Sequence, residues 1–227
     1  MLSTYFIQKF LKQVIKPKST IALGTSSISL QILKELAVHN IIKELDLKIV
    51  PTSTDIAHLA HEFHLHLSPI NHKIDLCIDF ADYADSYFNY IKTNTQSLIR
   101  DKMIARYAKE NYVFVYQQDF NAENIPAIPL EVSRFGTHLI EKELYAFGEA
   151  KIRTTKLGQR YKTLETNYII DLKLNTKILD FDDLDYKLNT TPGILETGLF
   201  VSYADKLFTV NKTIIKEELN KIRNGEK

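Results

Sequence analysis

The chain has 227 residues, of which 44% are hydrophobic and 25% charged, and its formal net charge is +1. This is the composition of a globular protein with enough mass for one large domain or two modest ones, and its charge balance favours no nucleic-acid partner. No apolar run reaches the roughly 18 residues of a membrane helix. The amphipathic N-terminal stretch has no small-residue cleavage site, so we predict a cytoplasmic protein that does not enter a membrane.

Strand and helix patterns alternate along the first half of the chain. Short apolar runs typical of strands occur at 20–23, 47–50, 65–67, 74–78 and 112–116. Helical apolar spacing occurs at 3–16, 28–38 and 55–63, and a further helix carries residues 100–102. Repeated strand–loop–helix units predict an α/β fold with a doubly wound, mostly parallel Rossmann-like sheet, whose loops gather at one edge.

The pattern changes to α+β over residues 128–199. A strand is expected at 128–132, a helix at about 135–147, strands at 150–155 and 166–174, and a short acidic helix at 180–188. We therefore predict a small α+β domain at 128–199, inserted into a Rossmann-like domain formed by 1–127 and 200–227. Residues 207–210 should supply the last strand of the first sheet, and 212–223 a final charged helix.

Acidic residues follow the apolar run at 74–78, which we expect to end as a strand at Asp79. Asp82 comes three residues later, then Lys92, and Asp101 lies in the first turns of the next helix. Residues just beyond the end of a parallel strand face the crevice where ligands bind. Two acids, an amine and a further acid would suit proton transfer on a polar small molecule. Turn residues, a helix cap and a solvated helix face at 100–102 would explain the same residues, and both interpretations remain open.

Hydroxyl-rich loops follow the strands at 20–23 and 47–50. The first is Gly24-Thr25-Ser26-Ser27 and the second is Pro51-Thr52-Ser53. Hydroxyl groups and free N–H groups at the start of a helix suit an oxyanion or a phosphate. Ser27 could also be an ordinary N-cap.

Metal binding is not expected. The histidines that suggest it are His58, His61, His64, His66 and His72. They follow no consistent ligand spacing, so we predict neither a metal nor another cofactor. The single cysteine, Cys77, lies within an apolar strand and should be a small core residue.

Seven segments lie in a characteristic order along nearly the whole chain. They are GTSSI at 24–28, VPTS at 50–53, DFADY at 79–83, KTNTQSLIRDK at 92–102, IPLEV at 128–132, ETNYIID at 165–171 and TPGILETGLF at 191–200. In this order the segments resemble those of type A ribose-5-phosphate isomerases. The resemblance implies interconversion of ribose 5-phosphate and ribulose 5-phosphate through an enediol, without a metal. It also implies a homodimer or homotetramer that binds a small sugar phosphate.

The resemblance also assigns roles to residues. It places the base at Asp101, with Asp79, Asp82 and Lys92 contacting the sugar hydroxyls and the developing oxyanion. The substrate-binding candidates are Gly24, Thr25, Ser26, Ser27, Thr52, Ser53, Thr93, Asn94 and Thr95. On this assignment, Asp101→Asn should abolish turnover and leave the melting temperature nearly unchanged.

Three features differ from the family pattern. Asp101 stands where the family has a glutamate, and Thr93-Asn94-Thr95 replaces three glycines. The phosphate-binding lysine that the family carries after the strand at 112–116 has no counterpart, since no lysine occurs between Lys109 and Lys142. Two alternatives therefore stay open: a non-catalytic sugar-phosphate-binding or structural relative, and a related reaction on another sugar phosphate.

Overall fold

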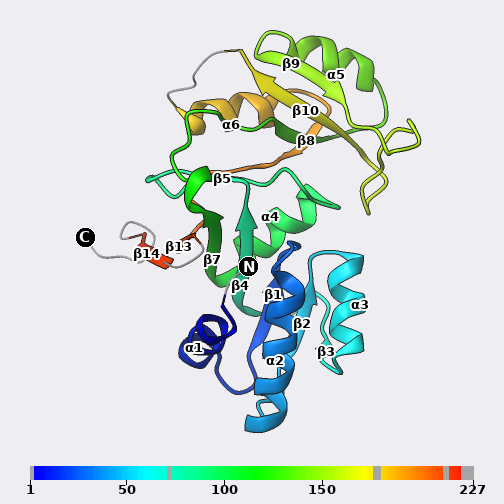
Figure 1. The fold of residues 1–227 in the computed structure, drawn as a ribbon. Coiled ribbons are helices and arrows are strands. Elements are labelled where there is room, and N and C mark those ends of the chain that lie inside the picture. Colours follow the sequence, from blue (N-terminus) through cyan, green and yellow to red (C-terminus); the bar gives the residue numbers. More distant parts are fainter. Residues whose placement is uncertain (1–2, 71–72, 176–179, 212–214, 221–227) are drawn as a thin grey trace. The chain divides into compact units, whose positions relative to one another are not determined.

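The chain forms two compact units, and Figure 1 shows their elements. The computed structural model describes residues 3–70, 73–175, 180–211 and 215–220. Unit 1 comprises Met1–Phe80, Met103–Gln117 and Ala204–Lys227, as far as these ranges are described. Unit 2 comprises Ala81–Lys102 and Gln118–Tyr203 within the same limits.

Unit 1 is built around a seven-stranded sheet with the order β14-β13-β7-β4-β1-β2-β3. Its strands are β1 (Thr20–Leu23), β2 (Lys48–Pro51), β3 (His66–Leu67), β4 (Ile74–Ala81), β7 (Ala108–Tyr116), β13 (Lys206–Val210) and β14 (Ile215–Leu219). β1 is parallel to β2 and β4, β2 to β3, and β13 to β7, whereas β14 is antiparallel to β13. Its helices are α1 (Thr4–Val14), α2 (Ser29–Lys43) and α3 (Thr54–Glu62). The predicted α/β class with a mostly parallel sheet is confirmed.

The first helix shows how the apolar pattern builds the core of unit 1. The Ser3 hydroxyl caps α1 by accepting from the Phe6 N–H, and the helix buries Ile7, Phe10 and Leu11 at helical spacing. The Phe10 ring meets the rings of Phe114 and Phe208, each with centroids 5.4 Å apart. Burial of each such side chain contributes about 1.5–3 kcal/mol. The pattern at 3–16 therefore correctly predicted a helix.

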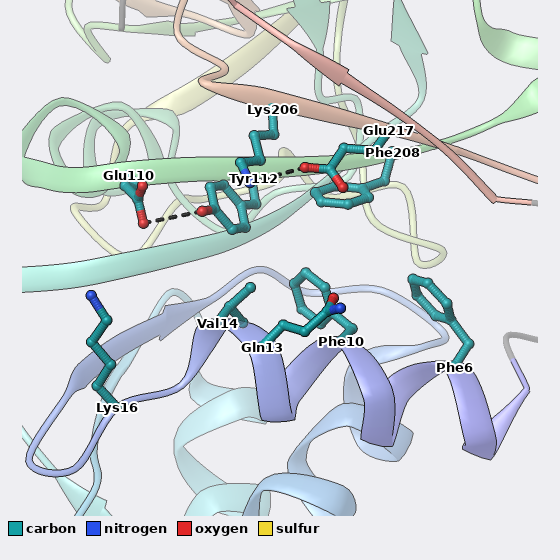
Figure 2. Close-up of a pocket in the computed structure, with 10 residues that line it drawn as sticks. All are labelled: Phe6, Phe10, Gln13, Val14, Lys16, Glu110, Tyr112, Lys206, Phe208 and Glu217. Atoms are coloured by element: carbon teal, nitrogen blue, oxygen red, sulfur yellow. Dashed lines mark hydrogen bonds and ion pairs between the residues drawn. The ribbon is translucent and has the colours of Figure 1, made fainter.

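A pocket of about 440 Å³ lies between α1 and the strands β7, β13 and β14 of this unit. In Figure 2 its aromatic side chains face one another and its charged groups lie around them. The Tyr112 hydroxyl donates to Glu110 at 3.1 Å, and Lys206 pairs with Glu217 at 2.9 Å. Burial, with the charge of Glu110 second, raises the pKa of Tyr112. These pairings stabilise the unit.

The expected final helix over 212–223 is wrong where the structure describes it. Residues 215–219 form β14, whose register with β13 runs from Val210↔Ile215 to Lys206↔Leu219. Helix propensity is a weak preference, and the unpaired edge of β13 offers a ladder of hydrogen bonds that overrides it. The charges of β14 suit an edge strand. Residues 212–214 and 221–223 of the expected helix lie outside the described residues.

Unit 2 contains an antiparallel sheet with the order β11-β8-β10-β9 and a smaller one with the order β12-β6-β5. The first consists of β8 (Ile128–Val132), β9 (Gly148–Ile152), β10 (Tyr168–Leu174) and β11 (Ile194–Thr197). The second consists of β5 (Tyr83–Ala84), β6 (Tyr90–Ile91) and β12 (Leu199–Phe200). Helix α5 (Thr137–Leu144) contacts β9, and helix α6 (Phe181–Thr190), capped by Asp180, contacts β11. This is the α+β texture that the sequence indicated.

Unit 2 extends beyond the 128–199 segment. Residues 81–102 join it because β6 pairs with β12, and the Asn121 N–H donates to the Ala84 carbonyl. Helix α4 (Leu98–Tyr107) begins in unit 2 and ends in unit 1. The division into 1–127 with 200–227 and 128–199 stays a prediction about folding domains, and the compact units divide the chain differently. Within the described ranges no helix has the length and apolarity to cross a lipid bilayer.

Candidate active site

A buried ion pair joins two of the predicted catalytic residues in unit 2. The Lys92 Nζ lies 2.9 Å from Asp101 Oδ2, and each side chain is only 4% exposed. Lys92 follows β6, and its N–H donates to the Gly198 carbonyl at 3.1 Å. Asp101 lies in the first turn of α4. Burying a charge is costly unless it is paired, so Lys92 and Asp101 depend on each other for their buried positions.

The same carboxylate oxygen accepts a second hydrogen bond. The Thr95 hydroxyl donates to Asp101 Oδ2 at 2.7 Å, and its oxygen accepts from the Ser97 N–H at 3.0 Å. Both the hydroxyl and the ammonium stabilise a carboxylate on Asp101. The Asp101 carboxylate is thus held in a fixed orientation next to a positive charge, and a carboxylate so placed could accept a proton from a substrate.

Asp82 anchors the loop between Lys92 and Asp101. Its Oδ2 accepts from the Thr93 N–H at 2.6 Å and from the Thr93 hydroxyl at 2.7 Å. Asp82 and Asn94 are exposed, whereas Lys92 and Thr95 are buried. Unit 2 therefore brings together Asp82, Lys92, Thr93, Thr95 and Asp101.

The alternative of an ordinary solvated helix face at 100–102 is wrong for two of the three residues. Only Arg100 is exposed, and it pairs with Glu165. Lys102 is buried; its Nζ lies 2.8 Å from Glu196 Oε1 and donates to the Leu199 carbonyl at 2.8 Å. Lys102 therefore fixes α4 against β11 and β12.

Glu131 is a site-shaping residue to which the sequence analysis gave no role. It lies in β8 with 0% of its surface exposed, and it accepts five hydrogen bonds of 2.7–3.3 Å. The donors are the Ser97 hydroxyl, the Leu98 and Ile99 N–H groups, the Thr163 hydroxyl and the Asn167 amide. A carboxylate at the start of α4 satisfies the free N–H groups there and complements the helix dipole. The only signal in the sequence was a charge within the otherwise apolar run IPLEV.

Asp79 lies in unit 1, and it does not follow its strand as predicted. β4 continues to Ala81, and Asp79 is 2% exposed within it. Its Oδ1 accepts from the Phe80 N–H at 2.9 Å. A β-carbon added to Gly24 on the neighbouring strand end would lie 2.1 Å from that oxygen. The missing side chain at Gly24 makes room for a buried carboxylate, so the charge does not end the strand.

The hydroxyl loops of unit 1 meet at the ends of the parallel strands β1 and β2. The Thr25 hydroxyl donates to Ser53 Oγ at 2.7 Å, and the Thr52 hydroxyl donates to the Leu23 carbonyl at 2.8 Å. Ser53 also caps α3 by accepting from the Ile56 N–H. The structure thus brings Thr25, Thr52 and Ser53 together as predicted from the parallel arrangement.

The interpretation of Ser27 as an N-cap is wrong. Ile28 holds the cap position of α2, and Ser27 is exposed. The Ser26 hydroxyl oxygen accepts from the Ile28 N–H at 3.0 Å, and Ser29 Oγ accepts from the Ser26 N–H at 2.8 Å. The turn is therefore closed by the hydroxyl groups on either side of Ser27.

We expect Gly24→Ala to destabilise unit 1 by about 1–3 kcal/mol, because the new methyl group overlaps the Asp79 carboxylate. The loss should shrink in an Asp79→Ala background, which removes the overlapping oxygen. Melting temperatures of the two single variants and the double variant measure this coupling. An equal loss in both backgrounds would show that the carboxylate is not the obstacle.

The histidines do not form a metal centre in the described part of the chain, where no three side chains of histidine, cysteine, aspartate or glutamate are grouped as ligands. His72 lies outside that part. Cys77 is buried with Ala22 and Val50, as predicted for a small core residue.

A mostly parallel α/β sheet and a carboxylate held beside a buried ammonium define the class of protein. A carboxylate can remove a proton from carbon, and an ammonium can stabilise the oxyanion that results. These two groups are typical of an enzyme that transfers protons on a small polar substrate.

Comparisons with known proteins agree and are more specific. The model of the family described as ribose 5-phosphate isomerase A (phosphoriboisomerase A) matches residues 48–213. Ribose-5-phosphate isomerase A of Thermoplasma volcanium is 30% identical over 87% of this chain and 83% of its own length. Its counterpart in Dinoroseobacter shibae is 32% identical over 90% of this chain and 82% of its own length. The solved ribose 5-phosphate isomerase A of Methanocaldococcus jannaschii has a TM-score of 0.86 and 26% identity, covering 96% of this chain and 98% of the solved one. The chain belongs to the ribose 5-phosphate isomerase A family.

Proposed function

We propose that this chain, an aldose–ketose isomerase of the ribose 5-phosphate isomerase A family, interconverts ribose 5-phosphate and ribulose 5-phosphate with Asp101 as the base. The observation that carries the proposal is the buried contact of 2.9 Å between Asp101 and Lys92, to which Thr95 adds a hydrogen bond of 2.7 Å. The contact supplies both a proton acceptor and a positive charge.

In this mechanism the Asp101 carboxylate removes the proton from C2 of the open-chain aldose. The electron pair of that bond forms the C1=C2 double bond, and the carbonyl oxygen O1 takes the negative charge. The Lys92 ammonium stabilises this oxyanion. The proton then returns from Asp101 to C1, O1 takes up a proton to become a hydroxyl, and O2 gives up its hydroxyl proton in exchange and becomes the carbonyl oxygen. Substrate and product are isomers, so no redox partner is consumed.

The other predicted residues keep their roles in this proposal. Asp79 and Asp82 would accept hydrogen bonds from sugar hydroxyls. The remaining candidates would bind the sugar phosphate through hydroxyl, amide and N–H groups: Gly24, Thr25, Ser26, Ser27, Thr52, Ser53, Thr93, Asn94 and Thr95. Asp82 already holds Thr93, so its contribution includes shaping the loop.

A charge distribution in unit 2 bears on where the phosphate binds. Asp119 follows β7, in the segment that lacks the family's phosphate-binding lysine, and burial, with the charge of Asp82 second, raises the pKa of Asp119. Two neighbouring carboxylates would repel a phosphate. Hydroxyl and N–H groups at the start of a helix suit an anion, so we propose that those of the Gly24–Ser27 loop bind the phosphate.

The proposal extends to the assembly and its location. We propose a homodimer or homotetramer in the cytoplasm, on the strength of the family. Light scattering of the purified protein distinguishes the two assemblies. The non-catalytic alternative gains no support from the described residues.

The direct test is conversion of ribose 5-phosphate to ribulose 5-phosphate by purified protein. We expect turnover that phospho-erythronic acid inhibits competitively. A ribose-5-phosphate isomerase with a TM-score of 0.87 and 28% identity to this chain was solved in complex with that compound. Its carboxylate resembles the charge of the enediolate, so it should bind more tightly than the substrate. An inactive protein, assayed beside an active family member prepared identically, would refute the proposed reaction.

A further inference from the structure

We infer that Arg153 is a positioning residue that fixes the loop between Lys92 and Asp101, so that substitution of Arg153 lowers turnover although the residue is not a base or an oxyanion donor. The inference rests on the proposed function of that pair. The loop is Thr93-Asn94-Thr95, the segment that replaces three glycines of the family pattern.

Arg153 binds the loop through its backbone. One terminal nitrogen, Nη2, donates to the Thr93 carbonyl at 3.0 Å. The guanidinium is itself held by Asp171, to which Nε donates at 2.9 Å and Nη2 makes a second contact. The two side chains are 20% and 30% exposed. A fork-shaped pair of this kind fixes the guanidinium in both position and orientation.

The pair stands on a rigid base. Arg153 directly follows β9, and its N–H donates to the Ile169 carbonyl at 2.8 Å, which continues the pairing of β9 with β10. Asp171 lies within β10. Because Asp171 lies in the four-stranded sheet and the Arg153 N–H extends its pairing, the hydrogen bond to Thr93 ties the loop to that sheet.

A second clamp holds the other end of the loop. The Tyr161 hydroxyl donates to the Thr95 carbonyl at 3.2 Å, and the Tyr161 N–H donates to the Arg153 carbonyl at 2.9 Å. The carbonyls on both sides of Asn94 are therefore fixed by one segment, residues 153–161.

The fixed loop matters because its ends carry the chemistry. Lys92 precedes Thr93, and the Thr95 hydroxyl donates to the Asp101 carboxylate. If the Thr93 carbonyl loses its donor, the loop can shift, and the ammonium and the hydroxyl shift with it. A displacement of about 1 Å in a reacting group costs on the order of a hundredfold in rate. Arg153 thus acts on the reaction through Lys92 and Thr95.

The experiment compares Arg153→Ala with Arg160→Ala. Arg160 lies on the same segment, but its guanidinium is over the Tyr168 ring, 5.4 Å from the centroid, so it serves as a matched control for the loss of an arginine. We expect kcat/KM to fall about 10–100-fold in Arg153→Ala and less than threefold in Arg160→Ala. Added guanidinium ion should restore part of the activity of Arg153→Ala alone. Arg153→Lys should remain impaired, because an ammonium cannot form the fork.

Asp171→Asn provides a second route to the same answer if Arg153→Ala fails to fold. This variant keeps Arg153 but weakens the hydrogen bonds that hold its guanidinium. We therefore expect kcat/KM to fall at least threefold, without rescue by guanidinium ion. The inference is overturned if Arg153→Ala, or Asp171→Asn in its place, matches Arg160→Ala in an active wild-type background. It is also overturned if the fall in rate is accompanied by a lower melting temperature and guanidinium restores nothing. An inactive wild type would instead refute the proposed reaction.

Discussion

Asp101→Asn is expected to lower turnover by at least about a thousandfold, within the range that general-base catalysis spans. It should also lower stability, contrary to the expectation from sequence alone. The carboxylate lies 2.9 Å from a lysine that is 4% exposed, and removing one partner of a buried ion pair costs as much as about 3–5 kcal/mol. For a chain of this size that corresponds to about 6–20 °C in melting temperature.

The double variant Lys92→Met/Asp101→Asn separates the two effects. It replaces the ion pair by neutral side chains of similar size, so we expect a melting temperature above that of Asp101→Asn and no turnover. Assays of the isomerisation and thermal unfolding of the single variants and the double variant complete the cycle. Retained activity in Asp101→Asn would remove Asp101 from the role of base. A double variant no more stable than Asp101→Asn would show that the buried pair is not the source of the destabilisation.

The sequence predicted those features that short-range patterns determine. Apolar runs located β1, β2 and β7, and helical spacing located α1 and α3 to within a few residues. The grouping of Thr25 with Thr52 and Ser53 followed from a general rule, that the ends of parallel strands meet at one sheet edge. The order of the seven segments then supplied the family and, with it, the assignment of Asp101 as the base.

The sequence did not predict features that depend on a distant partner. Asp79 is compatible with a buried strand only because Gly24, 55 positions earlier in the sequence, leaves space for its carboxylate. β14 is a strand because β13 lies beside it. Arg153 meets the Thr93 carbonyl across 60 positions, and no spacing rule connects them. Such contacts form only in the assembled fold, so the local sequence around each residue does not predict them.

Glu131 should be among the residues least tolerant of substitution, because five donors share its buried carboxylate. Glu131→Leu would leave those donors without an acceptor at about 1–3 kcal/mol each, so we expect a loss of more than about 4 kcal/mol or a protein that does not fold. Glu131→Gln keeps an oxygen for the start of α4, but its amide NH2 group cannot accept from the Thr163 hydroxyl or the Asn167 amide, which must reorient. It removes the charge that complements the helix dipole, a loss of about 1–2 kcal/mol.

The prediction is tested by the order of stability of these variants. Urea unfolding should rank wild type above Glu131→Gln and Glu131→Gln above Glu131→Leu, and hydrogen exchange of the Leu98 and Ile99 amides should accelerate in the same order. Glu149→Gln is the matched control, because Glu149 lies in the same sheet but pairs with Lys151 at the exposed surface, where such a pair contributes at most about 1 kcal/mol. If Glu131→Leu unfolded at the urea concentration of Glu149→Gln, the start of α4 would not depend on Glu131. If the ranking holds, the helix that carries Asp101 is fixed by a carboxylate that takes no part in the reaction.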